Sequence, residues 1–237
     1  MGEVIHGDYG RYIQDGKKLL HSVTNYELHK GLYSGHNDHN YFEIAHTIRR
    51  AFDENGGIYR GMKLYSFVDN HDVDKIASKL NEEDHLIPVH ALLYFLPGIP
   101  SVYYGSEFGI SGKKEGSSDA PLRPALDLQE LEKDAPHPEL EQWIRKLSKI
   151  RKKHPACVEG NYQELLLTNR QYAFCRYSDS DYLLIAVNND SQEAQVQIPV
   201  DRKDTYTDAQ TGDEYLPENG KVSITLPPCG CVLLERS

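Results

Sequence analysis

The sequence predicts an α/β region followed by an antiparallel β-sandwich. The first two-thirds of the 237 residues alternates short apolar runs with helical stretches, the pattern of βα units around a parallel sheet. The last third contains short strands of alternating polarity with turn signals about every eight to twelve residues, as in an antiparallel sandwich. We therefore place a domain boundary near residue 160, between an α/β region over 1–160 and a sandwich over 161–237.

The α/β region begins with two strand-and-helix pairs. KKLLHSVTNYEL, residues 17–28, is predicted to be a strand and its exit. The following helix has five apolar residues at helical spacing, namely Tyr41, Ile44, Ala45, Ile48 and Phe52. After a turn-rich segment, KLYSFVDNHD over 63–72 is predicted to be a second strand. The next helix, 85–98, is apolar nearly all round, as expected of a helix packed between a sheet and its neighbours, and it ends at Pro97 and Gly98.

The region closes with a third strand and a last helix. IPSVYYGSEFGI, over 99–110, is predicted to be the strand, and it leads into a polar loop. The helix begins near Pro138 and stops at His154 and Pro155. Its apolar stripe consists of Leu140, Trp143, Ile144, Leu147 and Ile150.

Five segments of the last third are predicted to be strands: 162–168, 172–178, 182–189, 194–200 and 222–235, with turns over 210–221. The four cysteines form no CxxC pair, so we interpret them as reduced core residues. Cys229 and Cys231 are expected on one face of a strand, because side chains alternate with period two. No companion cluster with ligand spacing supports a metal site there.

The parallel sheet is expected to be incomplete. Only about four βα units are present, whereas a closed eight-unit barrel needs roughly 250 residues. GEVIHG, over 2–7, resembles the end of a strand whose body would precede Met1, so we expect the sequence to begin within a fold. A doubly wound open sheet is the alternative, but no glycine-rich phosphate loop follows any strand.

The composition argues against two classes of partner. Acidic residues outnumber basic ones, 36 to 26, so the net charge of -10 opposes binding to nucleic acid. No apolar run approaches the ~20 residues of a membrane-spanning helix, and the first residues lack the features of a signal peptide.

Polar clusters at predicted strand ends are the candidate site, because parallel α/β folds build active sites at the C-terminal ends of strands. Each has a structural alternative: Glu3 as a solvated carboxylate, Asp72 or Asp74 as a cap for the helix containing Ile76, and Glu107 as a satisfied group in an aromatic patch. Four clusters qualify: Glu3 with His6 and Asp8, residues 24–27, residues 69–72, and residues 103–107.

Together these clusters suit glycoside hydrolysis, in which one carboxyl is held protonated and another ionised across a sugar ring. Neighbouring Tyr, His and Asn side chains can stack on the sugar or bind its hydroxyls. A metal site made of carboxylates and histidines is the weaker alternative, because no HxH or HxxxH pair accompanies them.

Three blocks of this sequence resemble the α-amylase family, glycoside hydrolase family 13, and most closely its neopullulanase, cyclomaltodextrinase and maltogenic-amylase-like members. They are GEVIHG at 2–7, FVDNHD at 67–72 and GIPSVYYGSE at 98–107, in the family's order. The resemblance implies the C-terminal half of a (β/α)8 TIM barrel, from the end of strand five through helix eight, followed by an antiparallel β-sandwich.

The resemblance also implies roles for individual residues. Glu3 matches the general acid/base, and Asp72 matches the carboxylate that fixes sugar hydroxyls and stabilises the transition state. His71 matches the histidine that contacts the same sugar, Asn70 completes that block, and Tyr104 lies near the site. The implied reaction is retaining hydrolysis of α-1,4-linked glucan oligosaccharides, with no cofactor.

Three departures from the family's pattern limit this expectation. The family's strand-four block, with its nucleophilic aspartate, and its strand-three block are absent from these 237 residues, and both would lie upstream of Met1. The family's usual metal-binding insertion is also upstream, so we expect no calcium site. DAPLRPALD replaces the usual arginine-rich segment after strand eight, which leaves the role of Arg123 open.

We therefore expect the C-terminal portion of an α-glucan hydrolase that is inactive by itself and needs the missing half of the barrel or self-association. A transglycosylase using the same site is one alternative. The other is a non-catalytic sugar-binding or structural half that completes another chain, since an open parallel edge must be covered. A cytoplasmic location is expected from the maltodextrin-processing relatives and the absence of any sign of disulfide bonding.

Overall fold

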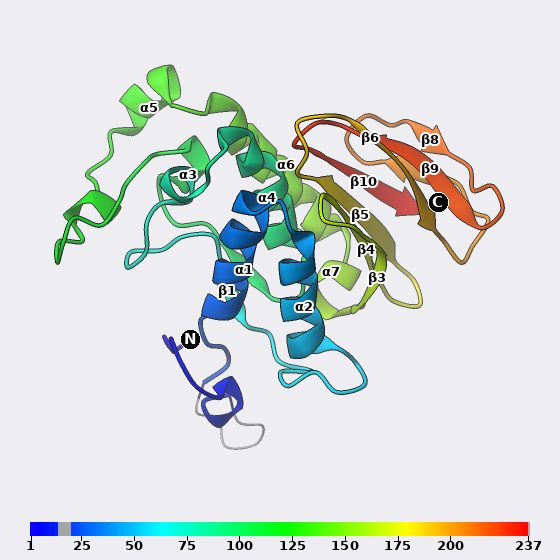
Figure 1. Ribbon diagram of the computed structural model, residues 1–237, viewed down its shortest axis with the longest axis horizontal. Coiled ribbons are helices and arrows are strands. Elements are labelled where there is room, and N and C mark those ends of the chain that lie inside the picture. The colour runs from blue at the N-terminus through cyan, green and yellow to red at the C-terminus, as the bar shows by residue number, and fades with distance from the viewer. Residues whose placement is uncertain (14–19, 237) are drawn as a thin grey trace.

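The computed structural model describes residues 1–13 and 20–236. Figure 1 shows helices packed against one side of an antiparallel β-sheet formed by the C-terminal part of the chain. The helices of the α/β region are η1 (Tyr9–Arg11), α1 (Tyr26–Asn37), α2 (Tyr41–Phe52), α3 (Ile76–Lys79), η2 (Glu83–His85), α4 (Leu86–Phe95), η3 (Ser106–Phe108), η4 (Ala120–Leu122), α5 (Leu128–Asp134), α6 (Pro138–Lys153) and α7 (Ala156–Glu159). None of the described helices has the length and apolar character needed to cross a membrane.

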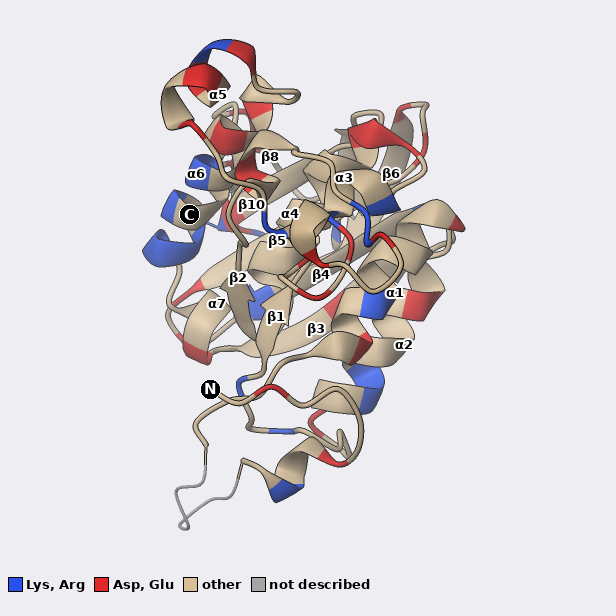
Figure 2. Cartoon of the chain, turned by 90° about the vertical axis from the view of Figure 1, so that its left-hand side faces the viewer, with Lys and Arg blue, Asp and Glu red and all other residues tan. Residues whose placement is uncertain are grey.

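Four chain segments run parallel and side by side in the α/β region. The segment at Gly2 bridges to Val23, and Thr24 bridges to the first strand, β1 (Tyr65–Phe67). That strand pairs with β2 (Ile99–Ser101), next to it in Figure 2. The segments follow one another in chain order, as successive βα units do. Whether they are half of a barrel stays a prediction, and so does the domain boundary at residue 160.

Helices α2, α4 and α6 occur where the periodicity predicts them. All five residues of the predicted α6 stripe lie on the helix, and four of them are buried: Leu140, Ile144, Leu147 and Ile150. Helix α4 has nine buried residues among its ten, which explains why its sequence lacks a polar face.

Helix α1 is an element that the sequence pattern did not predict. For residues 17–28 the pattern predicts a strand and its exit, but the strand is reduced to a bridge at Val23 and Thr24, and α1 starts at Tyr26. Lys17, Lys18 and Leu19 lie outside the described residues. Asn25 caps the helix by accepting a hydrogen bond from Leu28 N at 3.1 Å. Two glycines weaken its intrinsic helix propensity, and tertiary packing overrides that weakness.

The predicted antiparallel sheet is confirmed. Six strands pair in the order β3 (Asn161–Leu167), β4 (Gln171–Tyr177), β5 (Tyr182–Asn188), β10 (Cys231–Arg236), β7 (Tyr206–Asp208) and β8 (Glu214–Tyr215). A second layer consists of β6 (Ala194–Pro199) paired with β9 (Lys221–Leu226).

Both faces of the six-stranded sheet are covered. On β5, Leu183, Ile185 and Val187 pack into the core shared with α4 and α6, whereas Leu184 and Ala186 pack toward β6 and β9. All seven residues of β5 are therefore buried, which accounts for its continuous apolar run.

The expectation for the cysteine pair was wrong in one respect. The predicted strand 222–235 is two strands, β9 and β10, and Cys229 lies in the turn between them with φ +41°. Cys229 and Cys231 therefore do not share one strand face. All four cysteines are buried free thiols, as predicted.

Candidate functional site

The site lies where the first, third and fourth parallel segments end. Glu3 follows the bridge at Gly2, residues 69–72 follow β1, and residues 103–107 follow β2. Because parallel strands place their C-terminal ends on one edge of a sheet, residues distant in sequence meet there.

Glu3, His71 and Asp72 come together at this edge. One carboxylate oxygen of Glu3, one ring nitrogen of His71 and one carboxylate oxygen of Asp72 all lie within 4.8 Å of one another. His71 Nε2 is 3.2 Å from Asp72 Oδ2. Glu3 is exposed, while His71 and Asp72 are half-buried, so all three are open to a ligand from solvent. Glu3 is solvent-exposed, as the alternative of a solvated carboxylate expects, and it also has partners on two other segments.

A hydrogen-bonded relay connects Glu3 to the residues after β1. The Tyr26 hydroxyl donates to Glu3 Oε1 at 2.7 Å, and Asn70 Nδ2 donates to the Tyr26 hydroxyl at 3.0 Å. Burial raises the pKa of Tyr26 to about 12, so the phenol keeps its proton at neutral pH. Asn70 Oδ1 also accepts from the backbone N–H of Asp72 at 2.8 Å, which fixes the turn that presents Asp72.

Tyr26 is a site residue that the sequence did not single out, although it lies within the polar cluster 24–27. An aromatic residue at the first position of a helix carries no sequence signal of its partner 23 residues away.

Arg123 supplies the positive charge of the site. Its Nη2 lies 3.3 Å from Asp72 Oδ1, and its Nε donates to the carbonyl oxygen of His71 at 3.3 Å. The guanidinium also lies 3.9 Å from Asp119 Oδ2. The role that the sequence left open is therefore contact with the His71–Asp72 pair, from the loop that follows η4.

Asp69, rather than Asp72 or Asp74, holds helix α3. Its Oδ2 accepts from Ile76 N at 2.7 Å, and its Oδ1 accepts from the Ser106 hydroxyl at 2.6 Å. Asp74 instead accepts from Lys114 N at 2.8 Å. The structural alternative that assigned Asp72 to capping is wrong, and Asp72 is free to face the site.

Tyr104 is a neighbour of the site but points elsewhere with its hydroxyl, which donates to the carbonyl oxygen of Pro124 at 3.1 Å. Tyr103 is the tyrosine whose ring packs near His71, at 6.3 Å between centroids. Beneath both rings lies the fully buried Lys75, whose Nζ is 4.1 Å from the Tyr103 centroid and donates to the Tyr104 carbonyl oxygen at 2.5 Å. The buried amine thus fixes the loop after β2 against the segment after β1.

Two groups of side chains in the described part of the chain have the composition and spacing of metal ligands. One is Glu3, His71 and Asp72, where the nearby Arg123 competes with a cation for Asp72. The other is His39, Glu82 and His85, away from the strand ends.

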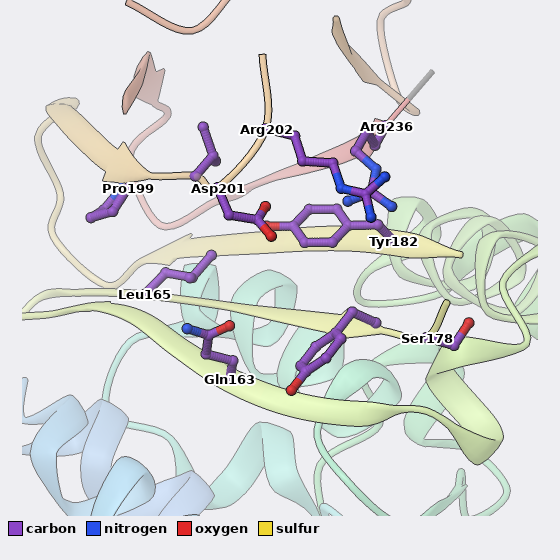
Figure 3. A pocket seen from close by; sticks show the side chains of 10 residues that line it. Gln163, Leu165, Ser178, Tyr182, Pro199, Asp201, Arg202 and Arg236 are labelled. Carbon is purple, nitrogen blue, oxygen red and sulfur yellow. The ribbon is translucent and has the colours of Figure 1, made fainter. Parts of the chain in front are cut away.

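A separate half-open cavity of about 520 Å³ lies in the antiparallel region (Figure 3). Among its lining residues, the Arg236 guanidinium stacks 4.7 Å from the Tyr182 ring centroid, with Asp201 and Arg202 nearby. This cavity contains neither Glu3 nor Asp72, so the carboxylate pair remains the candidate for chemistry.

Comparison with known proteins gives several curated relatives of similar resemblance, of which three are described. The β/α-amylase of Paenibacillus polymyxa is 26% identical over 244 residues, covering 96% of this chain and 19% of that protein. Neopullulanase 2 of Thermoactinomyces vulgaris is 25% identical over 171 residues, with 70% and 28% covered. A cyclomaltodextrin glucanotransferase of Bacillus sp. (strain 38-2) is 25% identical over 162 residues, with 62% and 22% covered. The chain thus spans less than a third of the length of these relatives.

Solved structures show the same fold. An Anoxybacillus α-amylase superposes with a TM-score of 0.78 at 23% identity, covering all of this chain and 51% of the other. AmyP in complex with maltose superposes with a TM-score of 0.82 at 17% identity, covering 98% and 54%.

A family model, the maltogenic amylase C-terminal domain, matches residues 162–233, which include most of the antiparallel region. The sequence resemblance stated above is confirmed by these comparisons. The chain is thus similar, over nearly its whole length, to the C-terminal portion of glycoside hydrolases of the α-amylase family.

Proposed function

We propose that this chain provides the general acid/base and the stabilising carboxylate of a retaining glycosidase that hydrolyses α-1,4-linked glucan oligosaccharides. The observation that carries the proposal is the convergence of Glu3, His71 and Asp72 within 4.8 Å from segments almost 70 residues apart. The four parallel segments in chain order support assignment of residues 1–160 to the second half of a (β/α)8 barrel.

The proposed mechanism assigns the proton transfers to Glu3. As the acid it protonates the glycosidic oxygen while that oxygen leaves C1 of the sugar, and a nucleophilic carboxylate forms an ester bond to C1. Glu3, now ionised, takes a proton from water as the water attacks C1 and the ester bond breaks. Tyr26 donates to the Glu3 carboxylate at 2.7 Å, which orients that carboxylate for both proton transfers.

Asp72 and His71 bind the sugar that carries the developing positive charge. Arg123 pairs with Asp72 Oδ1 at 3.3 Å and leaves the second carboxylate oxygen of Asp72 beside His71 Nε2. Sugar hydroxyls can then bind His71 and Asp72 together. Asn70 holds the turn that presents Asp72. Tyr103 and Tyr104 provide aromatic surface at the edge of the site.

The nucleophile of this reaction would come from outside the described site. These 237 residues contain no counterpart of the family's strand-four block, so we propose that another segment supplies it. The substrate class is supported by AmyP, whose solved structure holds maltose, and by the neopullulanase among the relatives.

Maltotriose hydrolysis tests this function. We expect no turnover by the 237-residue chain, and turnover by a polypeptide in which the same residues follow the strand-three and strand-four blocks. In that longer polypeptide Glu3→Gln is expected to lower kcat by about 10²- to 10⁴-fold, because a carboxamide cannot transfer the proton. Glu193→Gln, the same substitution at an exposed glutamate of the antiparallel region, is the matched control. Unchanged turnover in Glu3→Gln would remove Glu3 from the acid role.

Transglycosylation is a second candidate, favoured by the similarity to a cyclomaltodextrin glucanotransferase. The same carboxylates serve both reactions, and the acceptor decides between them. Products longer than maltotriose at high acceptor concentration would identify transfer.

A non-catalytic sugar-binding or structural role is the candidate from another class. It requires that the exposed edge of the parallel sheet be covered by a partner segment. Turnover by the longer polypeptide that depends on Glu3 contradicts it, whereas maltotriose binding without any turnover supports it.

A further inference from the structure

We propose that a cavity beside Trp143, at the junction of α6 and the antiparallel region, is a second binding site for glucan oligosaccharides. The cavity has a volume of about 530 Å³, within the range of roughly 300–1,000 Å³ found for small-molecule sites. None of the described residues that line it belongs to the cluster of Glu3, His71 and Asp72. The choice of an α-1,4-linked glucan as the ligand rests on the proposed function of the chain.

Trp143 is the exception in the apolar stripe of α6. The other four residues of that stripe are buried, whereas Trp143, the single tryptophan of the chain, is half-buried and lines the cavity. Its Nε1 donates to the carbonyl oxygen of Ile87 at 3.0 Å, which fixes the indole ring against α4. A fixed and partly exposed aromatic ring offers apolar surface to a ligand at little cost in side-chain entropy.

Polar residues of α6 surround this ring. Glu139, Gln142 and Lys146 lie three or four residues apart, so they share the face of the helix that carries Trp143, and all three line the cavity. Gln142 is exposed, and its amide has no hydrogen-bond partner in the part of the chain that the structure describes. This amide can therefore bind a ligand as both donor and acceptor.

The antiparallel region supplies the opposite wall. It consists of Gln210, which follows β7, and residues 227–231 at the turn from β9 to β10. Gln210 Nε2 donates to the carbonyl oxygen of Cys231 at 2.9 Å, and this bond leaves its Oε1 available as an acceptor. Lys146 Nζ donates to the carbonyl oxygen of Gln210 at 3.3 Å and thereby joins the two walls. The cavity is thus formed before any ligand binds, as is usual for small-molecule sites.

The chemistry of the lining favours a neutral ligand rich in hydroxyl groups. The two charged residues among the described lining, Glu139 and Lys146, have opposite signs, so neither an anion nor a cation is attracted strongly. Burial raises the pKa of Cys229 to about 11 and also raises the pKa of Cys231, so both thiols stay protonated at neutral pH and are poor metal ligands.

An oligosaccharide matches both kinds of surface in this cavity. Its hydroxyl groups act as donors and acceptors, which the amide, carboxylate and ammonium groups of the lining can satisfy. The C–H faces of its pyranose rings are apolar, as are the indole ring of Trp143 and the two prolines of the turn.

The test is a titration of the 237-residue chain with maltotriose, followed by tryptophan fluorescence. Because Trp143 is the single tryptophan, we expect a saturable change in its emission that reports binding in this cavity. Gln142→Ala and Lys146→Met should each weaken binding by about 2- to 10-fold, the effect of losing one hydrogen bond. Gln195→Ala, at an exposed glutamine of β6, is the matched control and should bind as the parent chain does.

Two further titrations separate this site from other causes of a fluorescence change. Asp72→Asn alters the carboxylate cluster and should leave the Kd from fluorescence unchanged. Sorbitol has hydroxyl groups but no pyranose ring, so it should produce no saturable change. All variants are compared in samples whose circular dichroism spectra match that of the parent chain.

The proposal would be overturned by an unchanged emission at tens of millimolar maltotriose, or by a Kd that Gln142→Ala and Lys146→Met both leave at the parent's value. A response lost in Asp72→Asn, or an equal response to sorbitol, would also overturn it. Absence of binding here together with Glu3-dependent turnover in the longer polypeptide would contradict only this second site. Binding here together with unchanged turnover in Glu3→Gln would contradict only the proposed role of Glu3.

Discussion

Asp69→Ala is the substitution that best tests how the structure holds the site together. Asp69 is 1% exposed and joins two elements: Oδ2 accepts from Ile76 N at the start of α3, and Oδ1 accepts from the Ser106 hydroxyl of η3. Alanine removes both acceptors at once. It also leaves the Ser106 hydroxyl, itself 1% exposed, without its partner.

The magnitude follows from these two losses. Losing the side-chain acceptor at a helix start costs about 1 kcal/mol, and leaving a buried hydroxyl unpaired costs about 1–3 kcal/mol. Burial raises the pKa of Asp69, so removing the buried carboxylate recovers part of this cost. We expect the free energy of unfolding to fall by about 2–3 kcal/mol. Asp69→Asn keeps an acceptor for Ile76 N and an amide for Ser106, so its free energy of unfolding should fall by only about 1 kcal/mol.

Urea unfolding of the chain and both variants measures this difference. The single tryptophan, Trp143 on α6, reports tertiary structure, and circular dichroism at about 222 nm reports the helices. Coincident transitions justify a two-state fit. The account of Asp69 as a paired acceptor would be refuted if Asp69→Ala lowered the free energy of unfolding by less than about 0.5 kcal/mol, or if Asp69→Ala and Asp69→Asn lowered it equally.

Three further predictions concern pH, the exposed ion pair and the N-terminal segment. Burial lowers the pKa of His29 and of His90 to about 4. The unfolded chain therefore binds protons that the folded chain does not. As the pH falls from about 6.5 to about 4, each of these two histidines should lower the free energy of unfolding by about 1.4 kcal/mol per pH unit. His90→Gln should reduce that slope. Arg123→Ala should change stability by less than about 1 kcal/mol in urea unfolding, because its ion pair is half-exposed. Thr24→Val should speed hydrogen exchange at Val4, whose N–H donates to the Thr24 hydroxyl at 2.9 Å, whereas Thr24→Ser should not.

Periodicity was sufficient to predict the larger elements. An apolar stripe predicts a helix buried on one face, and the structure shows this for α2 and α6. A continuous apolar run predicts a helix buried all round, and the structure shows this for α4. The alternating strands of the last third likewise predicted the antiparallel sheet.

Helix α1 could not be predicted in the same way, because its stability depends on a distant contact. At Gly35 a side chain would place its Cβ 2.9 Å from Ile44 Cγ1 on α2. The glycine that weakens the helix locally is therefore what allows α1 and α2 to pack closely. Local helix propensity reflects the destabilisation of α1 by Gly35, but not the close packing of α1 against α2 that Gly35 allows.

The same distinction between local and distant information applies to the site. Glu3, His71 and Asp72 were identified from their blocks, since each sits at the end of a predicted strand. Tyr26, Arg123 and the Asp69–Ser106 pair were not, because their roles consist of contacts across 23 to 52 residues. No periodicity encodes such contacts.

Parallel pairing explains why these distant residues meet in a defined geometry. The bridge from Gly2 to Val23 and the bridge from Thr24 to Tyr65 set the register of three consecutive segments. Thr24 strengthens the first of these contacts, since its hydroxyl accepts from Val4 N and donates to Val4 O at 3.2 Å. The position of Glu3 is thus set by backbone pairing on one side and by Tyr26 on the other. Glu3, fixed by backbone pairing and by the Tyr26 hydroxyl, is pre-oriented toward His71 and Asp72, which is what the proposed acid role of Glu3 requires.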